Sequence, residues 1–153
     1  MRRYALAMIA LVQRCLHSSV QVEGDVIGEI GPGMAVFVGY ETADSAALDA
    51  KLASKLLALR IFADDAGKMN RNVVEAGGNI LLVPNFTLAA DTTGGNRPSF
   101  TGALAPDLAR PRFDALASLF RPTLDNVQSG RFGADMKVDV LNDGPISLIL
   151  RFA

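Results

Sequence analysis

The sequence predicts a single α+β domain, residues 1–153, in which antiparallel sheets form a barrel-like core with two or so helices. Strand-like segments crowd the two ends of the chain, and two segments with helical periodicity lie between them. Nothing alternates in the manner of a strand–helix–strand series. Half of the 153 residues are hydrophobic, which is enough for one proper core.

The N-terminal block predicts four short strands. Period-two alternation and β-branched residues place them at residues 8–16, 19–24, 26–30 and 34–40. Glycine-containing turns separate the later strands of this block.

The first residues superficially resemble a secretion signal. Arg2 and Arg3 precede an apolar run, but Gln13 and Arg14 end it and no small-residue cleavage site follows. The run is also too short to span a bilayer. We therefore expect a cytoplasmic protein with no membrane partner, and residues 1–7 form an N-terminal extension if translation begins at Met8.

The first helix is expected over residues 44–60. Asp44 or Ser45 can cap its start. One face is leucine-rich, with a spacing that fits a helix packed on a core. The leucines of that face are Leu48, Leu52, Leu56 and Leu59.

The second helix is expected over residues 105–120, after a turn at 64–68 and a buried strand at 79–83. Pro106 suits the first turn of a helix. Pro111 removes a backbone donor, so it should kink or shorten this helix.

Strands are expected again around residues 123–132, 136–142 and 145–152. The tetrapeptide Asn142-Asp143-Gly144-Pro145 separates the last two. By general turn preferences alone it indicates a hairpin.

The chain lacks most of the side chains that ordinary hydrolases use. His17 is its one histidine and Cys15 its one cysteine, which is too few for a metal site of His and Cys ligands. No nucleophile elbow, zinc or phosphate-loop motif occurs. We expect no metal and no cofactor, and a lone His17 is more often structural or exposed than catalytic. Cys15 cannot form an internal disulfide, which fits a reducing compartment.

The carboxylates and the net charge restrict the function further. Two carboxylate pairs are suggestive, but Asp64-Asp65 lies in a turn and Asp135 with Asp139 more often faces solvent in such a strand. The net charge is only −1, so a nucleic-acid partner needs a local basic patch.

The stretch that follows the buried strand carries a possible site. Pro84 ends ladder pairing, so the backbone N–H groups after it can point away from a neighbouring strand. Such donors beside the Thr87 hydroxyl are suited to an oxyanion hole. An edge strand followed by the glycine-rich loop at Gly94-Gly95 is the alternative interpretation.

Six strings give the chain a family resemblance over nearly its whole length from Met8. They resemble, in this order, the D-aminoacyl-tRNA deacylase family, often called D-tyrosyl-tRNA deacylase. The resemblance implies a cytoplasmic homodimer with active sites at the dimer interface, which hydrolyses the ester joining a D-amino acid to the 3′ end of tRNA. DNA is not an expected partner. The strings are MIALVQR, RIFADDAGKMNRNV, FTLAADT, NRPSF, GRFGADM and NDGP.

The resemblance also implies roles for single residues. Gly144-Pro145 would carry a cis peptide bond and enter the partner subunit's site, where its main chain would reject L-amino acids and let glycine pass. Phe86 and Thr87 would contact the oxyanion and the substrate, and Arg14 would brace the Gly-Pro loop.

This chain departs from the family at two neighbouring positions. Asn85 would take part in substrate binding, although it is one methylene shorter than the usual glutamine. Pro84 replaces the usual serine and cannot donate its hydrogen bond. These two departures concern the support of the pocket and not the type of reaction.

The family's proposed mechanism is substrate-assisted. The 2′-hydroxyl of the terminal adenosine would help deliver water, in agreement with the scarcity of side-chain bases. Two alternatives remain: a relaxed deacylase for another mischarged tRNA, and a non-catalytic protein that binds the tRNA end. Candidate contacts to tRNA are Lys68, Arg71, Arg97 and Arg131.

Overall fold

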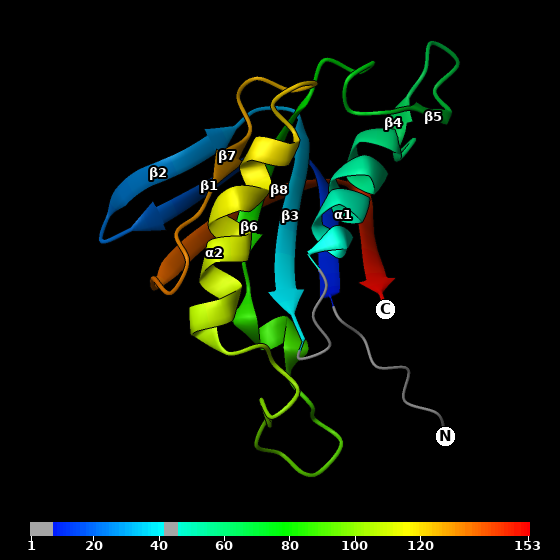
Figure 1. Ribbon diagram of the computed structural model, residues 1–153. Helices are drawn as coiled ribbons and strands as arrows, with labels where there is room; N and C mark the ends of the chain where they lie inside the picture. Colours follow the sequence, from blue (N-terminus) through cyan, green and yellow to red (C-terminus); the bar gives the residue numbers. More distant parts are fainter. Residues whose placement is uncertain (1–7, 42–45) are drawn as a thin grey trace.

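The computed structural model describes residues 8–41 and 46–153. It has a large curved sheet with both α-helices on one face (Figure 1) and a small two-stranded sheet. Two short 3₁₀ turns, η1 (Phe86–Ala89) and η2 (Ala117–Leu119), follow β6 and α2. The other elements are β1 (Met8–Val22), β2 (Asp25–Ile30), β3 (Gly33–Tyr40), α1 (Ala47–Ala58), β4 (Phe62–Ala63), β5 (Met69–Arg71), β6 (Asn79–Pro84), α2 (Pro106–Leu116), β7 (Gln128–Ser129) and β8 (Met136–Phe152).

The main sheet confirms the predicted fold class, an α+β domain with a barrel-like core. Its strand order is β2-β1-β3-β6-β7, and β8 pairs with the other side of β1. The pairs of β1 with β2, β3 and β8 are antiparallel, as expected. The pairs β3–β6 and β6–β7 are parallel instead. The chain crosses the face of the sheet in α1 between β3 and β6, and in α2 between β6 and β7.

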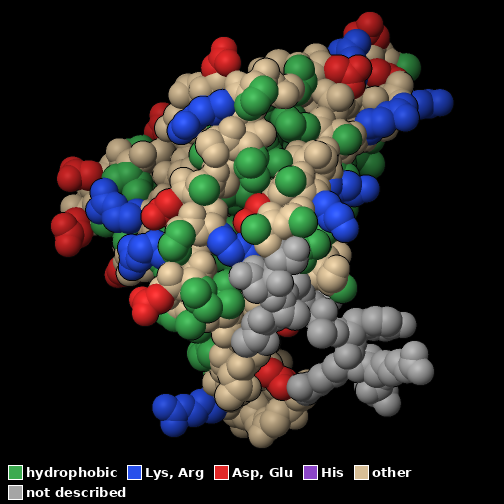
Figure 2. Space-filling model, in the orientation of Figure 1, with side chains coloured by type: hydrophobic (Ala, Val, Ile, Leu, Met, Phe, Trp, Pro, Cys, Tyr) green, Lys and Arg blue, Asp and Glu red, His purple; other side chains and the backbone are tan. Residues whose placement is uncertain are grey.

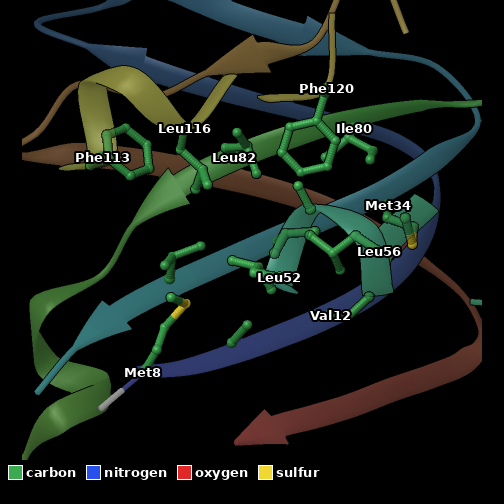
Figure 3. Close-up of a cluster of buried hydrophobic side chains, with 14 of the residues drawn as sticks. Met8, Val12, Met34, Leu52, Leu56, Ile80, Leu82, Phe113, Leu116 and Phe120 are labelled. Atoms are coloured by element: carbon green, nitrogen blue, oxygen red, sulfur yellow. The ribbon is translucent and has the colours of Figure 1, made fainter. Parts of the chain in front are cut away.

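The larger core lies between the sheet and the two helices (Figure 3). Leu52 and Leu56 of α1 and Phe113 and Leu116 of α2 pack against the alternate residues of β1, β3 and β6 that face them. A second cluster lies inside the curl made by β2 and the first half of β8. It consists of Cys15, Val20, Ile30, Leu81 and Val83.

The first helix agrees closely with its leucine pattern. Leu48, Leu52 and Leu56 are buried, whereas Leu59 is the C-terminal cap and only half-buried. The N-cap residue is Ala46, which makes no side-chain cap bond, and the expected caps Asp44 and Ser45 lie outside the described residues.

The second helix is shorter than expected but continues through Pro111. Pro111 is exposed on this helix, and the chain passes into the 3₁₀ turn η2 after Leu116. Within residues 8–41 and 46–153, no helix is long and apolar enough to cross a membrane.

Three strand predictions need correction. Residues 8–16 and 19–24 belong largely to one strand, β1, which runs to Val22. Of the strand expected around residues 123–132, only Gln128 and Ser129 are strand, because this segment meets only the edge of β6.

The hairpin indicated by Asn142 to Pro145 does not form. β8 is continuous, because β1 is long enough to pair with both of its halves. Asn142 pairs with Cys15, and Ser147 pairs with Gln13. The four residues between them, 143–146, therefore bulge out opposite Arg14, and we call this segment the β8 bulge.

Candidate functional site

The first cluster of predicted site residues lies at the end of β6. The Asn85 N–H donates to the carbonyl of Val38 at 2.8 Å, which fixes the start of η1 to β3. The Leu88 N–H closes the turn onto the Asn85 carbonyl at 3.3 Å. Phe86 and Thr87 are the first residues of η1, so their N–H groups have no acceptor within the turn. Both residues are exposed, so this end of η1 lies at the surface.

A hydrogen bond and an aromatic contact connect the side chains of this cluster. The Thr87 hydroxyl donates to Asn85 Oδ1 at 2.8 Å, so its proton is committed and its lone pairs remain available. The Phe86 ring packs on Phe100 with ring centroids 5.0 Å apart. The 92–98 loop between η1 and Phe100 is closed at its base by paired backbone bonds of Asp91 and Ser99.

A pocket of about 320 Å³ opens beside η1. Asn85 and Phe86 line one side, and residues of α2 and of the segment before β8 line the other. Arg110 is the one charged residue among those lining it. The complete lining is Pro84, Asn85, Phe86, Pro106, Arg110, Phe132, Gly133, Ala134 and Met136.

The second cluster is the β8 bulge, where the Gly144–Pro145 peptide bond is cis. Gly144 has a φ of 137°, and a Cβ there would lie 2.8 Å from the Ile146 nitrogen, so only glycine fits. Asn142 closes the base of the bulge. Its Oδ1 accepts from the Ile146 N–H at 3.1 Å, and its Nδ2 donates to the Ser147 hydroxyl at 2.9 Å.

Arg14 of β1 binds the same bulge. Its Nε lies 3.2 Å from the Asp143 carbonyl and 3.3 Å from the Asp143 carboxylate. Its Nη1 donates to the Ile61 carbonyl at 2.8 Å. Arg14 therefore joins the residue before Gly144 to the start of β4, and its side chain is only 15% exposed.

One subunit does not bring the two clusters together. The bulge lies opposite Arg14, which pairs with Met34 of β3, whereas η1 is fixed at Val38. Four residues along a strand correspond to about 13 Å, and the three strand steps from β8 to β6 to about 14 Å. Measured along the sheet, the two clusters of one subunit therefore lie further apart than a small ligand reaches.

The remaining polar candidates lie elsewhere. His17 is exposed, and its Nε2 lies 3.7 Å from a carboxylate oxygen of Glu29. Burial raises the pKa of the Cys15 thiol from 9.0 to about 11, so this side chain stays protonated near neutrality. Asp64 forms a turn with the backbone of Ala66 and Lys68, and Asp135 pairs with Lys137 at 3.0 Å. Among the residues that the structure describes, no group of three His, Cys, Asp or Glu could hold a metal ion.

The charges do not form one large basic field. Figure 2 shows Lys and Arg interspersed with Asp and Glu over the helix-covered face. Lys68 and Arg71 belong to the β4–β5 hairpin, where Arg71 pairs with Asp65 at 2.9 Å. Arg97 lies in the 92–98 loop beside η1, and Arg131 lines a different pocket near the tip of the β1–β2 hairpin.

Sequence reasoning missed Arg110 and Phe132 as pocket residues. The only available signal was the string GRFGADM, which contains Phe132. Nothing local to the sequence indicated that Arg110, on a helix, faces the segment around Phe132.

Comparisons with known proteins agree with the family resemblance. The family model described as D-Tyr-tRNA(Tyr) deacylase matches residues 11–151. A D-aminoacyl-tRNA deacylase of Xanthomonas axonopodis pv. citri is 50% identical over 145 residues, covering 94% of this chain and 99% of the relative. A D-aminoacyl-tRNA deacylase of Methylibium petroleiphilum is 52% identical over 143 residues and is covered to 94%, as is this chain.

Solved structures agree as well. One described as c-Myc DNA Unwinding Element Binding Protein has a TM-score of 0.89 at 33% identity, covering 95% of this chain and 99% of that one. One described as a probable eukaryotic D-amino acid tRNA deacylase has a TM-score of 0.83, covering 96% and 100%. Its 16% identity supports likeness of fold alone. Since the family model and relatives about half identical span nearly the whole chain, this protein belongs to the D-Tyr-tRNA(Tyr) deacylase family.

Proposed function

We propose that this protein is an enzyme that hydrolyses the ester bond of D-aminoacyl-tRNA and releases the free D-amino acid and the tRNA. The observation that carries the proposal is the near full-length match to D-aminoacyl-tRNA deacylases. The site beside η1 supports it, because main-chain donors with no acceptor within the turn lie next to a pocket there. The substrate is the 3′ end of aminoacyl-tRNA, and the reaction takes place in the cytoplasm.

The backbone of η1 stabilises the charge that develops in the reaction. Water attacks the ester carbonyl, and its oxygen forms the new bond to carbon while the carbonyl oxygen becomes negative. The N–H groups of Phe86 and Thr87 donate to this oxyanion. The bond to the 3′ oxygen then breaks, and that oxygen leaves with a proton from the water.

Asn85 and Thr87 orient the substrate. Because the Thr87 proton is donated to Asn85, the hydroxyl acts as an acceptor towards the substrate and not as a further oxyanion donor. The amino group of the D-amino acid donates a hydrogen bond to the Thr87 hydroxyl oxygen. The shorter side chain of Asn85 is long enough for this bond, which measures 2.8 Å.

Each site is completed by the second subunit of a homodimer. The two clusters of one subunit are too far apart to share a ligand, whereas a partner can place its own β8 bulge against η1. At Gly144 the main chain has no Cβ, so it can approach the α-carbon of the substrate closely. A D-residue presents hydrogen to this wall and an L-residue presents its side chain, so L-aminoacyl-tRNA is excluded and glycine passes.

The proton transfer does not need a protein base. Thr87, Asn85 and the η1 backbone have no group that titrates near neutrality, and His17 lies outside the pocket lining. The 2′-hydroxyl of the terminal adenosine, next to the ester, delivers the water. A substrate ending in 2′-deoxyadenosine should therefore react far more slowly at saturation, and equal single-turnover rates would contradict substrate assistance.

The decisive experiment compares D-Tyr-tRNA, L-Tyr-tRNA and Gly-tRNA with one enzyme preparation. Hydrolysis of the D-Tyr and Gly substrates with the L-Tyr substrate intact supports the proposal. Hydrolysis of all three would indicate a relaxed deacylase, and tRNA binding without hydrolysis would indicate a binding protein. The double substitution of Gly144→Trp and Thr87→Trp provides the inactive control.

A further inference from the structure

Arg110, an exposed residue of α2, lines the pocket beside η1 and contacts Phe132 in two ways. Its guanidinium carbon lies 5.1 Å from the centroid of the Phe132 ring, and its Nη1 donates to the Phe132 carbonyl at 3.3 Å. These contacts fix the plane of the guanidinium against the wall of the pocket. An arginine has several N–H donors, and the bond to Phe132 takes one of them.

The neighbouring glycine leaves room for this arrangement. A Cβ at Gly133 would lie 3.1 Å from Arg110 Nη2, closer than nine in ten real contacts of a Cβ atom. The φ of Gly133 is 79°, which also favours glycine. The turn after Phe132 is therefore shaped so that the guanidinium can lie over it.

The two arginines of α2 are used differently. Arg112 lies two residues further on and points to another side of the helix. It makes a bidentate ion pair with Asp49 of α1, with both bonds at 3.0 Å, and is 10% exposed. That ion pair fixes the rotation of α2, so Arg110 lines the pocket while Arg112 packs against α1.

The chemistry of the pocket selects the kind of group that Arg110 binds. The other lining residues are uncharged, and several are aromatic, proline or small. An arginine in such surroundings suits a phosphate, whose oxygens match the geometry of its N–H donors. At an aminoacylated tRNA end, the phosphate that precedes the terminal nucleoside is the RNA anion nearest the ester.

We infer that Arg110 is a substrate-binding residue that holds this phosphate and so positions the terminal nucleotide against η1. The inference rests on the proposed function, because it takes the aminoacylated tRNA end as the ligand. It adds a phosphate contact from α2 to the main-chain contacts of η1.

The test compares D-Tyr-tRNA with 3′-O-D-tyrosyl-adenosine, which has the same ester but no phosphate. Arg110→Gln should raise KM for the tRNA by about tenfold or more, the size expected for a lost charged hydrogen bond, with a smaller change in kcat. The slope of log Kd against log salt should fall by about one. Hydrolysis of the adenosine ester should be unchanged, and Arg110→Lys should keep part of the tRNA binding.

Arg121→Gln is the matched control, because it removes the same charge from an exposed position beyond η2, outside the pocket lining. It should leave both substrates unaffected. Equal KM changes for tRNA and adenosine esters after Arg110→Gln would overturn the inference, as would no change for either. A KM rise confined to D-Asp-tRNA would assign Arg110 to an acidic side chain and would also overturn it. A wild-type enzyme that hydrolyses neither ester would contradict the proposed function itself.

Discussion

The two clusters proposed to form one active site differ in how the fold supports them. η1 follows β6, whose residues Ile80, Leu81 and Leu82 are fully buried, and it is bonded to the buried strand β3. The β8 bulge belongs to a 17-residue strand in which no residue is buried. The hydrophobic core therefore holds the main-chain donors of η1 in place. The β8 bulge is held by a few polar side chains, on a strand that the core does not cover.

This difference bears on the proposed homodimer. β8 has β1 on one side only, and Leu141 and Ile149 on it are more than half exposed. A strand of this kind gains more from being covered than one already packed between neighbours.

Mixed dimers test whether the two clusters of different subunits meet. Gly144→Trp and Thr87→Trp should each inactivate their own homodimer. Mixing the two chains under conditions of subunit exchange should restore about one quarter of the wild-type activity, since half of the dimers are mixed and each has one intact site. The measurement is D-Tyr-tRNA hydrolysis after exchange. No recovery, with exchange verified by mass, would contradict a shared site.

Leu82→Ala and Ile149→Ala compare the two strands by stability. Leu82 is fully buried beneath the helices, so its truncation should lower the free energy of unfolding by about 2–5 kcal/mol. Ile149 is 54% exposed in one subunit, so its truncation should cost less than about 1 kcal/mol when the protein is dilute. Urea titrations at two protein concentrations separate folding from association. Equal, concentration-independent losses would contradict the comparison.

Cys15 tests the packing where β1 meets the base of the bulge. Because burial raises its pKa to about 11, the unfolded chain loses the thiol proton first as the pH rises above 9. The contribution of the protonated thiol is complete below pH 9, and about 2–3 kcal/mol should be lost as the pH rises to 11. The difference in unfolding free energy between wild type and Cys15→Ala isolates this effect. A difference that does not change with pH would contradict the burial of the Cys15 thiol in the folded protein.

Arg14→Ala tests how the bulge is held. Loss of the bonds to Asp143 and Ile61 should release the bulge and lower kcat/KM for D-Tyr-tRNA by about tenfold, as expected for lost bonds of a charged donor. Discrimination against L-Tyr-tRNA should weaken in parallel. Arg151→Ala is the control, because Arg151 is exposed and lies on β8, the strand that contains the bulge. Unchanged activity and discrimination would mean that Arg14 is not needed to position the bulge.

His17→Ala should have the smallest effect. The side chain is 46% exposed and meets Glu29 at 3.7 Å, a pairing that contributes little in water. Turnover should stay within about twofold of wild type, measured in single-turnover experiments. An inactive His17→Ala that still folds and binds tRNA would contradict the absence of a protein base.

Local patterns were enough for the elements that pack by simple periodicity. The leucine spacing predicted α1, and a short apolar run predicted β6, because both segments repeat their buried face along the chain. Six strings in register were enough for the family and for the candidate residues at η1 and in the β8 bulge. The sequence also excluded a metal site built from His and Cys ligands, since it has one of each.

The conformations of the ambiguous segments depend on contacts between distant parts of the chain. Turn-forming residues at 142–145 are compatible with a hairpin or a bulge, and the length of β1 selected the bulge by pairing with both halves of β8. The sequence could not place Arg110 near Phe132, because they lie 22 residues apart and meet only when α2 packs beside the segment that precedes β8. Contacts between distant segments depend on how the sheet curls and where the helices rest on it, and no local preference determines either.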